Sequence, residues 1–220
     1  MCGIFSIISK NKELNINEIK ECFEKGKNRG PEESRIVNYQ EKNIFGFHRL
    51  AINGIEDVTS MQPFNIENYI LICNGEIYNC KQLYKQMNII PKTGSDCEVI
   101  IHCYKKYGIS HTLQLLDGVF AFILYDKNTE NIYIARDTYG IRPLFISTEE
   151  DKYLIASEMK SLINIPNRKN NIYQFTPGNC LKINIKKNIE QIFSFSHCNS
   201  FTNYNITGEK DALFAIKHSL

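Results

Sequence analysis

A β-strand pattern begins at Gly3, two residues after the first methionine. Residues 3–8 read Gly-Ile-Phe-Ser-Ile-Ile, an apolar run with no polar lead before it. The first residues of a domain are usually frayed unless something ties them down. We therefore expect the amino terminus to be tied down by the rest of the fold, with Cys2 immediately before this strand pattern.

The rest of the chain alternates short strand patterns with polar turns. Further strand patterns cover residues 34–39, 44–47, 69–73, 119–125, 132–135, 144–147, 153–156, 180–185 and 192–195. Helical patterns cover residues 17–27, 95–107 and 111–116, with Ser95 and Asp96 as N-cap residues, Gly108 as a helix end and a short helix after Ser157. Many short strands flanked by a few helices predict an α+β fold with antiparallel sheets.

Length and composition set limits on the function. A chain of 220 residues can bury one full core, and a net charge of +2 indicates neither a nucleic-acid nor a membrane-surface partner. The 8 cysteines include no C-x-x-C pair and no Cys/His cluster at zinc spacing, which argues against a disulfide framework and a metal site. Without a signal peptide or an apolar run of transmembrane length, we expect a cytoplasmic protein.

Cys2 is the first candidate for a catalytic group. Its small side chain allows removal of Met1, which would leave a thiol and a free α-amine on one residue. A thiol titrates near about 8.5 and an α-amine near about 7.7–8, so the amine can accept the thiol proton without a histidine. On these two letters alone, an incidental cysteine at position 2 is the more common explanation.

Asn74 and Gly75 follow the apolar run that ends in Cys73. An Asn side-chain NH₂ beside a Gly backbone N–H can supply two donors to the oxyanion formed when an amide carbonyl is attacked. The same dipeptide is also the strongest short signal for a β-hairpin turn. The motif by itself does not decide between these interpretations.

Arg49 and Asp96 are candidates for binding a free amino acid. A planar guanidinium suits the carboxylate of such a substrate, and a carboxylate suits its ammonium. The alternatives are a surface arginine after a strand and an aspartate that only caps a helix.

Taken together, these residues resemble the class II glutamine amidotransferases, which are N-terminal-nucleophile hydrolases, and most closely the glutaminase domain of B-type asparagine synthetases. The resemblance runs from Cys2 through Gly178. It rests on residues 2–4, 29–31, 49–52, 62–63, 74–79, 94–100, 117–122, 136–137 with 140 and 143–144, 156–162 and 177–178. The chain departs from the family pattern at Asn28, Glu32, Asn53 and Ser60, none of which is a predicted site residue.

The resemblance implies a fold and a reaction. The fold is a four-layer αββα sandwich of two antiparallel sheets. Cys2 attacks the side-chain amide of glutamine, Asn74 and the Gly75 N–H stabilise the oxyanion, and water hydrolyses the thioester left after ammonia departs. Arg29 would order a loop near the site. No cofactor or metal is implied for this half-reaction.

The resemblance also implies how the substrate is held. Arg49 would bind the carboxylate, and Asp96, with the backbone around Glu76, would bind the ammonium. Main-chain groups of Leu50 and Ile52 would complete the pocket.

The family pattern further implies a two-part organisation. We expect an amidotransferase domain at residues 1–200, followed at 201–220 by a linker and the first helix, over residues 211–218, of an ATP-pyrophosphatase synthetase domain. That domain would use ATP and Mg²⁺ to activate aspartate. Its Ser-Gly-Gly-x-Asp-Ser loop does not occur in this sequence. The chain is therefore either a fragment, which we favour, or a stand-alone glutaminase with a partner in trans, and the resemblance also admits a homodimer.

Two alternatives stay open. Residues 136–144 are also similar to phosphoribosyl-pyrophosphate amidotransferases, and a glucosamine-phosphate amidotransferase is a further candidate within the class. The second alternative is a regulatory module that keeps the fold and has lost activity, although none of the residues above is missing from the pattern.

Overall fold

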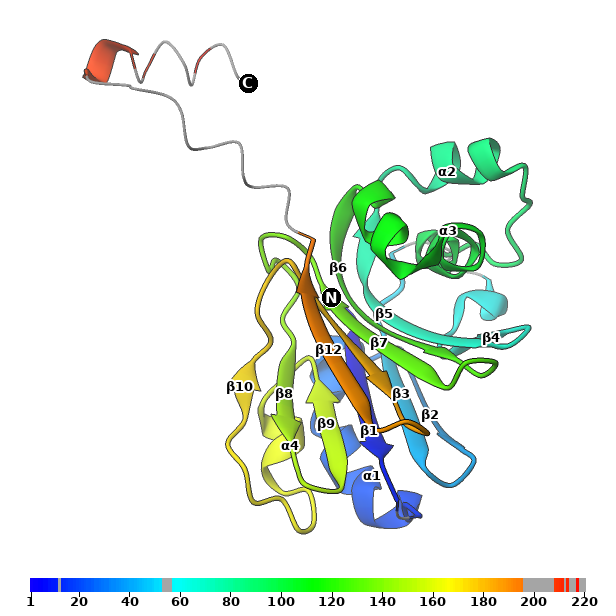
Figure 1. Ribbon diagram of the computed structural model, residues 1–220, viewed down its shortest axis with the longest axis vertical. Coiled ribbons are helices and arrows are strands. Elements are labelled where there is room, and N and C mark those ends of the chain that lie inside the picture. Colours follow the sequence, from blue (N-terminus) through cyan, green and yellow to red (C-terminus); the bar gives the residue numbers. More distant parts are fainter. Residues whose placement is uncertain (12, 53–56, 196–207, 212, 214–216, 218–220) are drawn as a thin grey trace.

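Two six-stranded antiparallel sheets form the centre of the protein (Figure 1). The computed structural model describes residues 1–11, 13–52, 57–195, 208–211, 213 and 217. The strand order of the first sheet is β10 (Tyr173–Gln174), β8 (Phe145–Thr148), β9 (Lys152–Ala156), β1 (Gly3–Ser9), β3 (Asn43–Arg49) and β2 (Glu33–Tyr39). That of the second is β12 (Ile189–Ser194), β11 (Asn179–Asn184), β7 (Asn131–Arg136), β6 (Gly118–Asp126), β5 (Tyr69–Ile77) and β4 (Phe64–Ile66).

Alternation along β1 shows how the layers are stacked. Ile4 and Ile8 belong to the core between the two sheets, whereas Phe5 and Ile7 pack outward against helix α1 (Ile16–Glu24). Successive side chains of a strand point to opposite faces, so a strand with apolar residues on both faces must be covered on both sides. This is why β1 is buried along its whole length.

Helices cover the outer face of each sheet (Figure 1). Helices α1 and α4 (Lys160–Ile163) cover the first sheet, and α2 (Cys80–Met87) and α3 (Val99–Leu115) cover the second. Short 3₁₀ turns are formed by η1 (Lys27–Arg29), η2 (Val58–Ser60) and η3 (Asp96–Glu98). The predicted α+β fold, a four-layer αββα sandwich, is confirmed.

Several elements differ from the sequence predictions. Helix α1 begins at Ile16, with Asn15 as its N-cap, and the predicted end at residue 27 is wrong because η1 follows instead. Gly108 separates two helical segments inside α3 through its backbone angle φ of 75°, as the sequence indicates. The sequence patterns above do not predict β4, α2 or β10.

Strand β5 continues through the Asn74-Gly75 dipeptide, which excludes a hairpin turn there. Gly75 pairs with Phe120 of β6. A Cβ atom at Gly75 would lie 2.8 Å from the Val119 carbonyl oxygen and 2.9 Å from the Phe120 Cβ. Glycine is needed here because the two strands approach closely.

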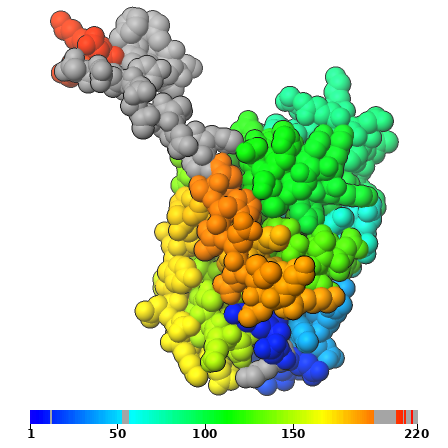
Figure 2. Space-filling model, in the orientation of Figure 1, coloured from blue at the N-terminus to red at the C-terminus, as the bar shows by residue number. Residues whose placement is uncertain are grey.

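The carboxyl-terminal prediction is only partly covered by the described residues. The boundary at residue 200 lies outside them. Of the helix expected over residues 211–218, residues 211, 213 and 217 are described and have helical conformation. On the face shown in Figure 2, the β11–β12 hairpin lies between the segment of β8 to β10 and helix α3.

No helix in the described part of the chain is long and apolar enough to cross a membrane.

Candidate active site

Cys2 lies immediately before β1, at the end where Gly3 pairs with His48 of β3. Its Sγ donates to the Leu50 carbonyl oxygen at 3.3 Å and accepts from the Leu50 N–H at 3.4 Å. Arg29 Nε donates to the Cys2 carbonyl oxygen at 2.9 Å, so Arg29 holds the segment that carries the thiol. The thiol is therefore fixed by contacts on both sides.

A cavity opens beside this thiol, with an empty volume of about 460 Å³ that includes its open mouth. Seven of the eight predicted site residues line it: Cys2, Arg49, Leu50, Ile52, Gly75, Glu76 and Asp96. These residues come from distant parts of the sequence, and only folding brings them together. Leu50 contributes its backbone contacts to Cys2, while Ile52 is 56% exposed.

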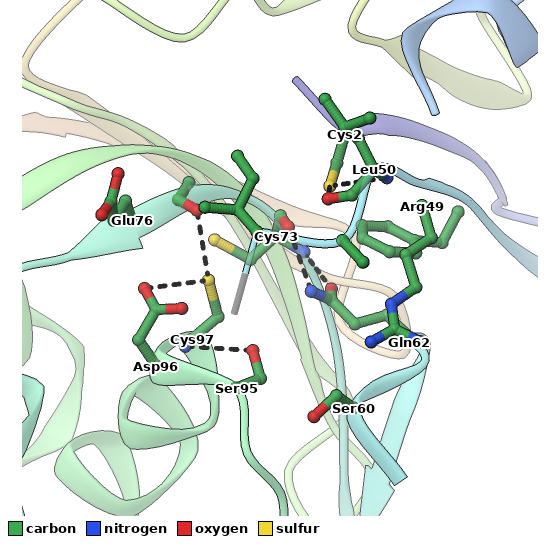
Figure 3. A pocket seen from close by; sticks show the side chains of 14 residues that line it. Cys2, Arg49, Leu50, Ser60, Gln62, Cys73, Glu76, Ser95, Asp96 and Cys97 are labelled. Carbon is green, nitrogen blue, oxygen red and sulfur yellow. Dashed lines mark hydrogen bonds between the residues drawn. The ribbon is translucent and has the colours of Figure 1, made fainter. Parts of the chain in front are cut away.

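The charges of the cavity are separated in space. Figure 3 shows Arg49 on one side and Glu76 with Asp96 on the other, with the Cys2 sulfur reaching toward the space from a third direction. Arg49 is buried although it is charged. A cation and two carboxylates at opposite sides of one small cavity match a molecule that carries both a carboxylate and an ammonium group.

One edge of β5 forms a wall of the cavity. β5 pairs with β6 along its whole length but with β4 only at residues 69–71. Farther along this edge, the Ile77 N–H donates to Asp96 Oδ2 at 2.6 Å, and Cys97 Sγ contacts the Gly75 carbonyl oxygen at 3.7 Å. Backbone groups two residues apart point to the same edge of a strand, so the Gly75 N–H also faces this wall.

Asn74 does not line the cavity. In β5 it shares a face with Ile70 and Ile72, which belong to the core between the sheets, and Cys2 packs against that same core. Asn74 is 2% exposed, and its side-chain Nδ2 is buried without a hydrogen-bond partner in the described part of the chain. An amide donor without a partner therefore lies on the face of β5 that is turned toward the sheet carrying Cys2.

Two thiols at the cavity have raised pKa values. Burial raises the pKa of the Cys2 thiol; the Leu50 N–H and the terminal ammonium act in the opposite direction but do not outweigh it. A hydrogen bond with Cys73, together with burial, raises the pKa of the Cys97 thiol well above its ordinary range. Both thiols are thus protonated near neutral pH, and Cys2 needs a base to become a nucleophile.

Buried Glu98 holds the backbone that precedes Asp96. Its carboxylate accepts from the N–H groups of Lys92 at 2.9 Å and Thr93 at 2.7 Å, and it bonds His102 Nε2 at 2.8 Å. Burial alone would raise the pKa of Glu98, but these hydrogen bonds outweigh it and the net pKa is lowered. A carboxylate stays charged at this buried position.

Asp57 ties the same backbone to the η2 turn. Its carboxylate accepts from the Thr59 N–H at 2.8 Å and the Gly94 N–H at 2.6 Å. Hydrogen bonds from Thr59 and Gly94 lower the pKa of Asp57 to about 2. Ser95 then caps η3 by accepting from the Cys97 N–H at 3.3 Å, which sets the position of Asp96.

Several residues of the cavity were not predicted to belong to the site: Phe47, Ala51, Ser60, Gln62, Cys73, Ser95 and Cys97. Gln62 and Cys97 stand inside motifs that carry the resemblance, which is the signal that could have found them. Of the four departures from the family pattern, Ser60 lines the cavity and Glu32 accepts from the Ala51 N–H at 2.6 Å. Asn53 lies outside the described residues.

The described residues contain no group of three or more His, Cys, Asp or Glu side chains that could hold a metal ion.

Comparison with known proteins identifies the family. The model of the glutamine amidotransferase domain matches residues 1–206, and the chain belongs to this family. The asparagine synthetase [glutamine-hydrolyzing] of Gallus gallus is 39% identical over 197 residues, covering 84% of this chain and 34% of that protein. The human protein of the same name is 33% identical, covering 97% of this chain and 40% of that protein.

A solved structure agrees with this assignment. Glutamine phosphoribosylpyrophosphate amidotransferase from B. subtilis superposes with a TM-score of 0.72 at 26% identity, covering 89% of this chain and 50% of that one. The chain spans about two-fifths or less of the length of the curated relatives described here.

Proposed function

We propose that the protein hydrolyses glutamine to glutamate and ammonia, with Cys2 as the nucleophile. The observation that carries this proposal is the shared cavity, which the Cys2 thiol, Arg49 and Asp96 line from different sides. Glutamine has a carboxylate and an ammonium at one end and an amide at the other. When Arg49 and Asp96 bind the carboxylate and the ammonium, the side-chain amide at the other end of glutamine can reach the Cys2 thiol.

The reaction begins once Met1 is removed. Met1 is 48% exposed, which leaves it accessible to a peptidase. The α-amine of Cys2 takes the proton of its own thiol, directly or through a water, and the sulfur attacks the amide carbon. This base is required because burial keeps the Cys2 thiol protonated.

The oxyanion is stabilised by Asn74 Nδ2 and the Gly75 N–H. Fixed donors aimed at a developing charge lower the barrier because they need no reorganisation during the reaction. The amide nitrogen leaves as ammonia after receiving the proton held by the α-amine. Water then attacks the γ-glutamyl thioester, which releases glutamate and restores the Cys2 thiol.

The proposed acceptor of the ammonia is an aspartate activated by ATP, so that the product is asparagine. Support comes from curated relatives at 33–39% identity that are named asparagine synthetases. The synthetase domain would be joined in cis or bind in trans, and ATP and Mg²⁺ would act there; the glutaminase itself uses no cofactor. We also keep the prediction of a homodimer, which sedimentation analysis would test.

A phosphoribosylpyrophosphate acceptor is the second candidate, because the solved structure described above belongs to such an enzyme. Mixing the protein with each candidate synthetase separates the two. Asparagine formed from aspartate and ATP supports the first acceptor, and phosphoribosylamine formation supports the second.

We further propose a cytosolic location, in keeping with the free thiols of all described cysteines.

Replacing the nucleophile tests the proposed function. Cys2→Ala should abolish release of glutamate from glutamine and leave the melting temperature nearly unchanged, because the thiol is half-buried at the cavity wall. Cys22→Ala serves as a control at a buried cysteine within α1, and it should keep full activity. Activity that survives Cys2→Ala would overturn the assignment.

A further inference from the structure

Gln62 bonds the backbone of β5 at the point where β5 loses its neighbouring strand. β4 covers the edge of β5 only as far as Leu71. Two residues later, the Cys73 N–H donates to Gln62 Oε1 at 2.6 Å, and Gln62 Nε2 donates to the Cys73 carbonyl oxygen at 3.1 Å. The side-chain amide of Gln62 thus pairs with β5 as the peptide group of a further strand would.

This pairing is buried and adjoins the cavity. Gln62 is 3% exposed, Cys73 is 1% exposed, and both line the cavity (Figure 3). A buried amide that pairs with both the donor and the acceptor of one residue fixes that residue in two directions. No other side chain among the described residues is shown to bond the Cys73 backbone.

The groups fixed by Gln62 stand next to the proposed oxyanion donors. Three contacts follow one another along the open edge of β5. The Gln62 side chain bonds the Cys73 backbone, Cys97 Sγ contacts the Gly75 carbonyl oxygen, and the Ile77 N–H donates to Asp96 Oδ2. The Gly75 N–H lies on this edge between two anchored points. Its direction is therefore set by the anchors at Cys73 and Ile77.

We propose that Gln62 is a positioning residue for glutamine hydrolysis, which acts as a surrogate strand and aims the Gly75 N–H and Asn74 at the oxyanion. The inference rests on the proposed function. Gln62 does not react with the substrate, and its effect passes through the β5 backbone. Because an oxyanion donor acts in the transition state, loss of its alignment lowers kcat and leaves the KM for glutamine almost unchanged.

The test compares Gln62→Met with wild-type protein that lacks Met1. Methionine has a similar length and fills the same volume without either hydrogen bond. A misplacement of about 1 Å can cost on the order of 10²-fold in rate, so we expect kcat to fall by about tenfold or more and KM to change by less than about twofold. In a Cys2→Ala background, calorimetry should give the same glutamine affinity with and without Gln62→Met.

Asn184→Leu is the matched control. Asn184 Nδ2 is likewise engaged with the backbone, donating to the Thr129 carbonyl oxygen at 2.9 Å, but Asn184 lies in β11 and does not line the cavity. This variant should lose stability and keep kcat. Gln62→Asn retains the amide oxygen and the NH₂ group on a side chain that is shorter by one methylene, and its kcat should lie between those of wild type and Gln62→Met.

Two results would overturn the inference: an unchanged kcat in Gln62→Met, or a raised KM at constant kcat, which would make Gln62 a substrate contact.

Hydrogen exchange on the wild-type protein tests the geometry even where a variant fails to fold. We expect the Cys73 amide to be strongly protected, and rapid exchange there would show that Gln62 does not cover this edge. An inactive wild type with a protected Cys73 amide would contradict the proposed function alone.

Discussion

At the scale of single residues, Asn74 combines the features of a group kept for function. Its Nδ2 is buried without a hydrogen-bond partner among the described residues. An unsatisfied buried donor costs about 1–3 kcal/mol of stability. In the proposed reaction, the oxyanion of the intermediate would be the partner of this donor.

Asn74→Ala should therefore lower activity without lowering stability. We expect kcat to fall on the order of 10²–10³, the usual effect of losing one oxyanion donor. The free energy of unfolding should not fall, because the lost NH₂ group is a buried donor without a partner among the described residues. Glutaminase kinetics and urea unfolding measure the two quantities, and a normal kcat would place the oxyanion elsewhere.

The sequence indicated the charged and nucleophilic residues of the cavity better than those that position them. Cys2, Arg49 and Asp96 have side chains whose chemistry suggested a role that the resemblance then favoured, and the structure places all three at one cavity. Gln62 has no reactive group, and its contact with Cys73 depends on where β4 ends. A strand end that is set by tertiary packing cannot be read from local pattern.

At the scale of elements, the segment before η3 is held by hydrogen bonds to ionised carboxylates. Asp57 bonds the Gly94 N–H at 2.6 Å and so links the η2 turn to the residues before Asp96. The pKa of Asp57 is lowered to about 2 from an ordinary value of 3.8. The charged form is therefore favoured by folding.

The sign of this shift gives a pH dependence. A lowered pKa in the folded state means that the stabilisation is complete above about pH 4 and is lost as the pH falls toward about 2. Asp57→Asn should be less stable than wild type at pH 5, with the difference shrinking between pH 4 and pH 2. Urea unfolding of both proteins across this range measures it, and a difference that is independent of pH would contradict the assignment.

The same scale shows where local pattern misleads. Asn-Gly is a strong turn signal, yet residues 74–77 continue β5 because β6 pairs with them throughout. Gly75 is required by the close approach of β6, where a Cβ would meet the Val119 oxygen at 2.8 Å. The buried residues of helix α2, Leu83, Tyr84 and Met87, have helical spacing, but the helix has only 8 residues, too few for a pattern that stands out.

At the scale of the whole molecule, the sandwich explains how Cys2, the proposed nucleophile, is held in place. β1 is covered by a sheet on one face and by α1 on the other, so the residue before it is held as firmly as an internal one. The apolar pattern of residues 3–8 predicted the strand, and the family resemblance implied the layers that cover it. The pairing of the other strands depended on the family resemblance, because single-strand patterns do not specify their neighbours.

The most direct measurement of the central claim joins intact mass with glutaminase rate. Preparations that differ only in the fraction of molecules retaining Met1 are assayed for glutamate formed from glutamine. A retained Met1 turns the α-amine of Cys2 into an amide without basicity, so the rate should rise in proportion to the fraction that begins at Cys2. A preparation that retains Met1 in every molecule and hydrolyses glutamine at the full rate would contradict the account.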